Sequence, residues 1–124
     1  MLINKTRKKI LVKKLKICKN IFKKSIGLMF SKKIKDVALV FPFKKEKITL
    51  LHMFFVFYQI DVLFLNEHKE VTELKENLRP FTFYRPRNKA KYIIELPAGK
   101  IGQTKTRVGD KIEILDIKKN NIFI

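Results

Sequence analysis

One apolar segment near the middle of the chain limits the possible folds more than any other feature. It runs from Leu50 to Leu65, and Ile48 to Leu65 spans 18 residues, about the shortest length of a transmembrane helix. Asp61 argues against such a helix, because an acidic residue near mid-span costs about 3 kcal/mol on insertion. Crowding of Phe, Val, Ile and Tyr favours strands instead. We therefore predict no transmembrane segment, and two adjacent buried strands joined near Tyr58 and Gln59.

The second of these strands is predicted to lie in the centre of a sheet. Side chains alternate between the two faces of a strand. One face would carry Ile60, Val62 and Phe64, and the other Asp61, Leu63 and Leu65. Because both faces are mostly apolar, both should be covered by other parts of the protein.

The rest of the chain is predicted to form short strands. At the N-terminus, residues from Ile10 to Ile17 fit either a basic amphipathic helix or a strand. Asn20 as an N-cap and Gly27 as a C′ residue favour a strand followed by a short helix over Ile21 to Ile26. Further strands are predicted at Val37 to Phe41, ended by Pro42 or placed at an edge, and at Val71 to Leu74, Ala90 to Leu96 and Ile112 to Ile117. The predicted turns are Lys44 to Lys47, Asn66 to Lys69 and Val108 to Lys111.

These elements predict a mainly β fold, a small jelly-roll or barrel-like sandwich with one short helix near the N-terminus. A chain of 124 residues lies near the commonest domain size, so we expect a single domain over residues 1–124. The single cysteine, Cys18, excludes an internal disulfide. No metal-ligand spacing, cofactor-binding motif or secretory signal is visible, and we expect a cytoplasmic protein without a cofactor or metal.

Positive charge is concentrated in the N-terminal third. The formal net charge is +18, and Met1 to Lys35 contains 13 Lys and Arg residues but no Asp or Glu. Such a field favours nucleic acid or another polyanion as partner. Codon bias towards lysine offers an alternative without a binding role. The candidate polyanion-binding residues are Lys8, Lys9, Lys13, Lys14, Lys16, Lys23 and Lys24.

Several linked motifs resemble a known family. They are GLMF at Gly27 to Phe30, the VFPF segment, HMFFVFYQIDVLFLN at His52 to Asn66, ENLRPF at Glu76 to Phe81, and YIIELPAGKI with TRVGD between Tyr92 and Asp110. Together they resemble the DUF192 family, also called UPF0127, and most closely its archaeal members. The resemblance implies a compact, mainly β domain with a short helix and a strand at the N-terminus. It implies no established activity.

Two carboxylates in apolar surroundings are the main candidates for chemistry. Asp61 can be a ligand contact or general base, or a structural carboxylate that accepts backbone N–H groups or pairs with an arginine. We favour the structural interpretation, because buried charges are usually satisfied in this way. Glu95 has the same two interpretations, and the two carboxylates would form an acid–base pair only if the fold brought them together.

The other candidates are polar or soft side chains near the same segments. His52 and Met53 lie in the apolar segment, where core roles are commoner than ligand roles. The complete candidate pocket or buried polar site consists of Asp61, Glu95, His52, Met53, Arg79 and Arg85.

Three functions remain open, and no catalytic residue is assigned. The first is a non-enzymatic binding or accessory module with a pocket for a small anionic or polar ligand near Asp61 and the loop from Asn77 to Arg87. The second is a nucleic-acid-associated basic protein that binds through the N-terminal third, with Phe22, Phe30 and the aromatic residues from Phe81 to Tyr84 stacking on bases. The third is an enzyme of unrecognised type that uses Asp61 and Glu95.

Overall fold

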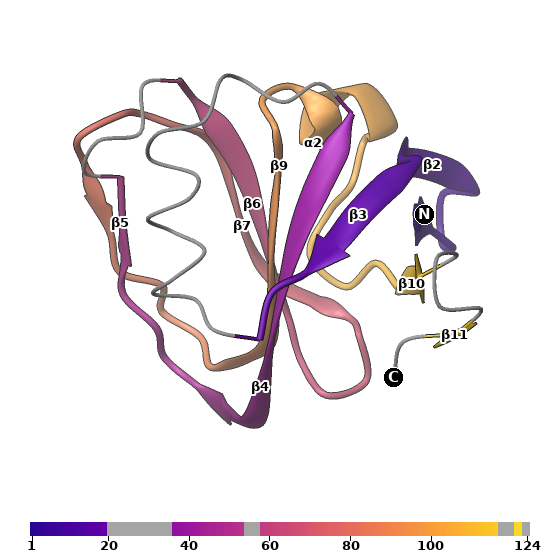
Figure 1. The fold of residues 1–124 in the computed structure, drawn as a ribbon, viewed down its shortest axis with the longest axis horizontal. Helices are drawn as coiled ribbons and strands as arrows, with labels where there is room; N and C mark the ends of the chain where they lie inside the picture. Colours follow the sequence, from indigo (N-terminus) through magenta and orange to yellow (C-terminus); the bar gives the residue numbers. More distant parts are fainter. Residues whose placement is uncertain (20–35, 54–57, 117–120, 123–124) are drawn as a thin grey trace.

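A five-stranded sheet occupies the middle of the molecule in the computed structural model, which describes residues 1–19, 36–53, 58–116 and 121–122. The strand order is β3-β4-β9-β6-β7 (Figure 1). The strands are β3 (Lys14–Ile17), β4 (Val37–Lys47), β6 (Ile60–Leu65), β7 (Val71–Leu78) and β9 (Ala90–Pro97). All six residues of β6 are buried, and β6 pairs with β9 on one side and β7 on the other. The predicted central strand is therefore confirmed.

Two smaller sheets cover the two faces of this sheet. One is the four-stranded sheet β11-β10-β1-β2, formed by β11 (Asn121–Ile122), β10 (Ile112–Asp116), β1 (Leu2–Asn4) and β2 (Lys9–Val12). The other is a two-stranded sheet of β5 (Leu51–His52) and β8 (Phe83–Tyr84). Figure 1 shows β5 on one side of the five-stranded sheet, and β2, β10 and the helix α2 (Lys100–Thr104) on the other.

Each pair of facing sheets encloses its own apolar core. The first core lies between the five-stranded and four-stranded sheets and contains the β6 residues Leu63 and Leu65. The second lies between the five-stranded sheet and β5–β8 and contains Ile60, Val62 and Phe64. Burial of one such side chain stabilises a fold by roughly 1.5–3 kcal/mol. Because its side chains alternate between the two faces of the sheet, β6 contributes to both cores.

The mainly β sandwich is confirmed, with differences in detail. The sheets do not close into a barrel, and α2 lies in the C-terminal half of the chain. The helix predicted over Ile21 to Ile26 lies outside the described residues. Within the described ranges, no helix is long and apolar enough to cross a membrane.

The prediction that the apolar segment forms two adjacent strands was wrong. β5 pairs with β8, whereas β6 pairs with β7 and β9, so the two strands belong to different sheets. Apolar composition identifies a strand as buried but does not identify its neighbour, because pairing depends on distant parts of the chain.

β4 is longer than predicted and continues through Pro42 to Lys47, so Lys44 to Lys47 is not a turn. The Val40 carbonyl accepts a hydrogen bond from the Cys18 N–H on the β3 side. Alternate residues of a strand direct their backbone N–H and C=O groups to the same side. The nitrogen of Pro42 therefore lies on the β3 side of β4, past the last residue of β3 that pairs with β4. Its missing N–H removes no hydrogen bond of the ladder there.

The other predicted elements are largely confirmed. The N-terminal strand is present as β2 and β3, separated at Lys13. The turn at Asn66 to Lys69 joins β6 and β7 as a hairpin, with the Asn66 N–H donating to the Glu70 carbonyl at 3.0 Å. The predicted strands near Ala90 and Ile112 are β9 and β10. β1 was not predicted.

Candidate functional site

Asp61 is completely buried and accepts three backbone hydrogen bonds. Its Oδ1 accepts the N–H of Asn77 at 3.0 Å. Its Oδ2 accepts the N–H groups of Gly99 at 3.1 Å and Ile101 at 3.0 Å. No arginine forms an ion pair with Asp61 among the described residues. The carboxylate therefore acts as a structural acceptor that ties β6 to the end of β7 and to the start of α2.

The Asn77 N–H needs this acceptor because the ladder is irregular there. Ile60 pairs with Leu78 and Val62 with Lys75, so β7 has one extra residue between these pairs. Such a bulge leaves a residue unpaired and bends the strand. Asn77 also has a positive φ of 53°, a conformation that Asn tolerates better than most residues. Asp61 thus holds the bulge near the end of β7.

Glu95 lies on the opposite face of the sheet from Asp61. Glu95 is paired with Val62 of β6 and Leu39 of β4, whose side chains lie in the second core. Asp61 is paired with Leu96, whose side chain lies in the first core. Side chains of directly opposed residues share a face. The two carboxylates therefore do not converge, and the acid–base pair considered from the sequence is not formed.

The carboxyl of Glu95 has an unusual environment. The residue retains some surface exposure, but its Oε2 is buried and has no hydrogen-bond partner in the part of the chain that the structure describes. Burial raises the pKa of Glu95 to about 7. Protonation makes such burial less costly, since the neutral acid loses less hydration than the carboxylate.

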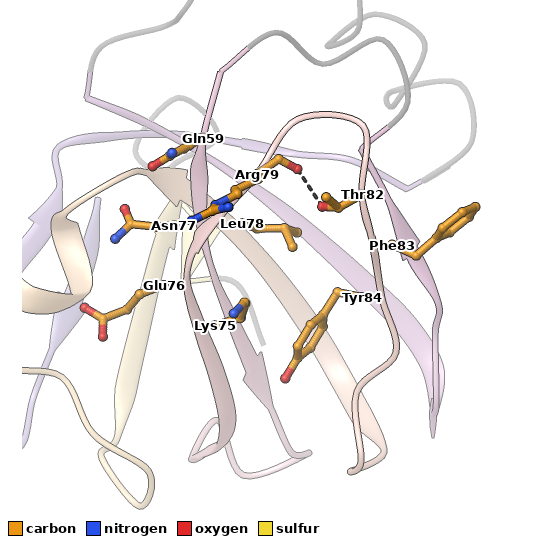
Figure 2. Close-up of a pocket in the computed structure, with 9 residues that line it drawn as sticks. All are labelled: Gln59, Lys75, Glu76, Asn77, Leu78, Arg79, Thr82, Phe83 and Tyr84. Carbon is orange, nitrogen blue, oxygen red and sulfur yellow. Dashed lines mark hydrogen bonds between the residues drawn. The ribbon is translucent and has the colours of Figure 1, made fainter.

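A polar cleft opens between β7 and β8, where the two strands diverge (Figure 2). Its volume is about 570 Å³. The lining residues are Gln59, Lys75, Glu76, Asn77, Leu78, Arg79, Thr82, Phe83 and Tyr84. The carboxylate of Glu76 points away from Tyr84 in Figure 2, whereas Lys75 lies on the same face of β7 as the second core. Lys75 and Glu76 therefore project to different sides of β7.

The cleft holds two cations, Lys75 and Arg79, and one carboxylate, Glu76. Within the described ranges, neither Lys75 nor Arg79 forms an ion pair. The Thr82 hydroxyl donates to the Arg79 carbonyl at 2.6 Å and closes the turn between β7 and β8. The cleft therefore presents Lys75 from β7 and Arg79 from a short, hydrogen-bonded turn.

Tyr84 forms one wall of the cleft and is held on two sides. Its ring lies 5.8 Å from the ring of Phe64, measured between centroids. Its hydroxyl donates a short hydrogen bond to the Glu73 carboxylate, which also accepts the N–H groups of Arg87 at 2.8 Å and Asn88 at 3.0 Å. Burial and the Glu73 carboxylate raise the pKa of Tyr84 to about 12. Tyr84 is thus a neutral, fixed wall at physiological pH.

The remaining predicted site residues are dispersed. Met53 is buried in the second core, and its backbone bonds to Thr82 and Phe81 at 2.7 Å each. His52 lies opposite Phe83 in the two-stranded sheet. Arg85 is exposed beyond β8. The structure brings only Arg79 of the predicted set into the cleft.

The candidate polyanion-binding lysines lie elsewhere in the molecule. Lys9 belongs to β2, and Lys14 and Lys16 to β3. Lys8 and Lys13 lie beside these strands, and all five are exposed. Lys23 and Lys24 lie outside the described residues. Among the described residues, no group of three His, Cys, Asp or Glu side chains is arranged to hold a metal ion.

Sequence reasoning did not identify Lys75 as a residue of the cleft, and it included Tyr84 only as part of the loop from Asn77 to Arg87. Lys75 interrupts the apolar pattern of a return strand, which on its own is typical of a solvated face. Tyr84 was recognised within an aromatic loop, but its position opposite β7 depends on the pairing of β5 with β8.

Comparison with known proteins places the chain among uncharacterised relatives. The profile of the DUF192 family, described as "Uncharacterized ACR", matches residues 2–114. A UPF0127 protein from Thermococcus sibiricus is 43% identical over 115 residues, covering 91% of this chain and 73% of that protein. Another from Pyrococcus furiosus is 37% identical over 112 residues, covering 90% of this chain and 96% of that protein.

Two crystal structures share the fold at low sequence identity. A protein from Sinorhizobium meliloti 1021, provisionally named a transcription regulator, has a TM-score of 0.73 and 22% identity, covering 80% of this chain and 79% of its own. A protein of unknown function from Novosphingobium aromaticivorans has a TM-score of 0.72 and 17% identity, covering 81% and 74%. At these identities the similarity concerns the fold alone.

Proposed function

Because this chain belongs to the DUF192 family, which is described as uncharacterized, we propose a function from its geometry: it is a non-enzymatic binding module that takes a small anion in the cleft between β7 and β8. The observation that carries this proposal is the convergence of Lys75 and Arg79, neither of them in an ion pair among the described residues, on one cleft of about 570 Å³. Pockets of this volume accommodate small molecules.

The donors of the cleft suit an oxyanion. The guanidinium of Arg79 offers several N–H groups in a plane, and Lys75 offers a mobile ammonium group. Gln59 and Asn77 add side-chain amides at the same cleft. Hydrogen bonds from charged donors are stronger than those between neutral groups. Carboxylate or phosphate oxygens are therefore the favoured ligand groups.

The surroundings of the cleft support binding with little reorganisation. Asp61 fixes the Asn77 backbone, and Glu73 fixes the Tyr84 ring. A site whose walls are already held loses less conformational entropy on binding. The Tyr84 proton is engaged by Glu73, and the raised pKa of Tyr84 makes it a poor acid at neutral pH. This arrangement favours binding over proton transfer.

The experiment is a calorimetric titration with inorganic phosphate and with citrate at pH 7 and low salt. Lys75→Met and Arg79→Met remove each charge and keep an aliphatic side chain. We expect each to weaken binding by about tenfold to a hundredfold, because a hydrogen bond to a charged group contributes roughly 1.5–3 kcal/mol. Lys89→Met is the matched control, since Lys89 is exposed and outside the cleft.

Two results would count against the proposal. One is the absence of heat with either anion for the parent protein. The other is an equal loss of affinity in Lys89→Met and in the two cleft variants, because that would reflect net charge rather than a site.

A further inference from the structure

The segment from Phe81 to Pro86, which contains β8, alternates between exposed and less exposed side chains. Phe81, Phe83 and Arg85 are exposed, whereas Thr82 and Tyr84 are half-buried, and the next residue, Pro86, is buried. Phe81 is 54% exposed and Phe83 is 58% exposed. In Figure 2 the ring of Phe83 points to the side opposite Tyr84, away from β7. Both side chains are therefore more than half exposed, and neither belongs to the second core.

The segment from Ile48 to Leu51, which leads into β5, repeats the same alternation. Ile48 and Leu50 are 43% and 55% exposed, and Leu51 is buried. Leu51 lies opposite Tyr84, and His52 lies opposite Phe83. We call the outward side of this sheet the outer face, formed by Ile48, Leu50, His52, Phe81, Phe83 and Arg85. It carries four of the six large apolar side chains that are exposed among the described residues.

The outer face is held in shape. The Phe81 N–H donates to the Met53 carbonyl, and the Met53 N–H donates to the Thr82 carbonyl, both at 2.7 Å. Phe81 has a positive φ of 61°, which costs a bulky residue about 1 kcal/mol or more. The two backbone bonds with Met53 maintain this conformation. Exposed aromatic rings on a fixed backbone mark an interaction surface.

The charge beside the outer face indicates an anionic partner. Residues 78–89 contain Arg79, Arg85, Arg87 and Lys89 and no acidic residue. Three of the five arginines of the chain are in this segment, although lysine is far commoner in the chain as a whole. Arginine stacks on flat rings and binds phosphate through paired N–H groups, whereas lysine acts as a point charge.

We propose that the outer face binds single-stranded nucleic acid, with Phe81 and Phe83 stacking on bases and Arg85 contacting the phosphate backbone. Residues two apart on one face of a strand are separated by about 7 Å, so each ring can take its own base. In a duplex the bases are already stacked and paired, so an unpaired strand fits better. The arginines of residues 78–89 and the two neighbouring rings of Phe81 and Phe83 favour nucleic acid over a lipid surface.

The test is fluorescence anisotropy with labelled oligo-dT and oligo-U of about 12 nucleotides, a length within the usual site sizes of such platforms. Phe81→Ala and Phe83→Ala should each weaken binding by about tenfold, because base–aromatic stacking contributes roughly 1–3 kcal/mol per base. Val108→Ala is the matched control, since Val108 is 61% exposed and lies outside the outer face. It should leave the affinity unchanged.

Arg85→Ala should lower the slope of log affinity against log salt by about one. Arg107→Ala is its control, because Arg107 is also exposed and is distant in sequence from the outer face. Phe83→Trp provides an independent readout, since the chain has no other Trp. Its fluorescence should be quenched by a stacked base, with affinity retained.

Three results would overturn this proposal. The first is the absence of oligonucleotide binding at 50 mM salt. Between 50 and 200 mM salt, counterion release favours binding most at 50 mM. The second is equal binding by Phe83→Ala and Val108→Ala, which would assign any binding to the N-terminal lysines instead. The third is a Phe83-dependent affinity for phosphatidylserine vesicles without one for oligonucleotides.

Discussion

Asp61 and Glu95 lie on the paired strands β6 and β9 but point to opposite faces of the sheet, Asp61 into the first core and Glu95 into the second. Asp61 accepts three backbone N–H groups, whereas Glu95 leaves a buried oxygen without a partner among the described residues. The two carboxylates therefore have different roles. Asp61 organises the backbone beside the cleft, and Glu95 makes the fold sensitive to pH.

Asp61→Asn should destabilise the protein by about 2–4 kcal/mol, because the amide replaces one acceptor oxygen with a donor that faces buried N–H groups. Urea unfolding at pH 7 measures the change. Asp36→Asn is the control with the same chemical change, and it should cost less than about 1 kcal/mol because its contact with Lys100 is at the surface. Equal costs for the two variants would contradict the structural role of Asp61.

Glu95→Gln should remove a pH dependence of stability. The folded pKa of Glu95 is raised from 4.5 to about 7 by burial. Between these values the folded state binds more protons than the unfolded state, so the parent should lose stability as pH rises through this interval. The full loss corresponds to about 3 kcal/mol.

The measurement is the free energy of unfolding at pH 5 and pH 8 for the parent and for Glu95→Gln. Glu95→Gln should be more stable than the parent at pH 8. Its free energy of unfolding should also change less between pH 5 and pH 8 than that of the parent. Glu113→Gln is a control, since Glu113 contacts Lys5 at the surface. A fall in stability from pH 5 to pH 8 that is as steep in Glu95→Gln as in the parent would refute the assignment to Glu95.

Tyr84→Phe should preserve the ring packing on Phe64 and remove one hydrogen bond to Glu73. We expect a loss of about 1 kcal/mol of stability. Burial acts to raise the pKa of Glu73, but its hydrogen bonds with Tyr84, Asn88 and Arg87 hold it below the usual value. In Tyr84→Phe the pKa of Glu73 should therefore rise, and an NMR titration of its carboxyl signal measures this change.

A double-mutant cycle with Glu73→Gln isolates this contact, because the cycle removes effects that each change has alone. Because the pKa of Glu73 is lowered in the folded state, its carboxylate stabilises the fold at pH values above 4.5, the ordinary pKa. This stability is lost as the pH falls below that value. Additive effects of the two changes would show that Tyr84 and Glu73 are not coupled.

Local patterns in the sequence predicted much of the β structure. The alternation from Ile60 to Leu65 identified a strand with two covered faces, and the polar run at Asn66 identified the turn of a hairpin. Both signals arise within a few residues. The neighbours of each strand were not predictable in this way, as the parallel pairing of β3 with β4 illustrates.

The candidate site was predicted less completely. Arg79 was identified from the composition of its loop, whereas Lys75 stands in an ordinary return strand and became notable only when β8 was placed opposite β7. The cleft exists because β8 pairs with β5 rather than with β7. That pairing joins residues about 30 positions apart, beyond the range of local patterns.

Amide NMR during a titration with inorganic phosphate tests the central claim most directly. Binding of the anion between β7 and β8 should shift the amide signals of Asn77, Arg79 and Thr82 with one common affinity, and Arg79→Met should remove the shifts. Shifts that concentrate instead on Lys13, Lys14 and Lys16, or signals that do not move with phosphate, would contradict the proposed anion site.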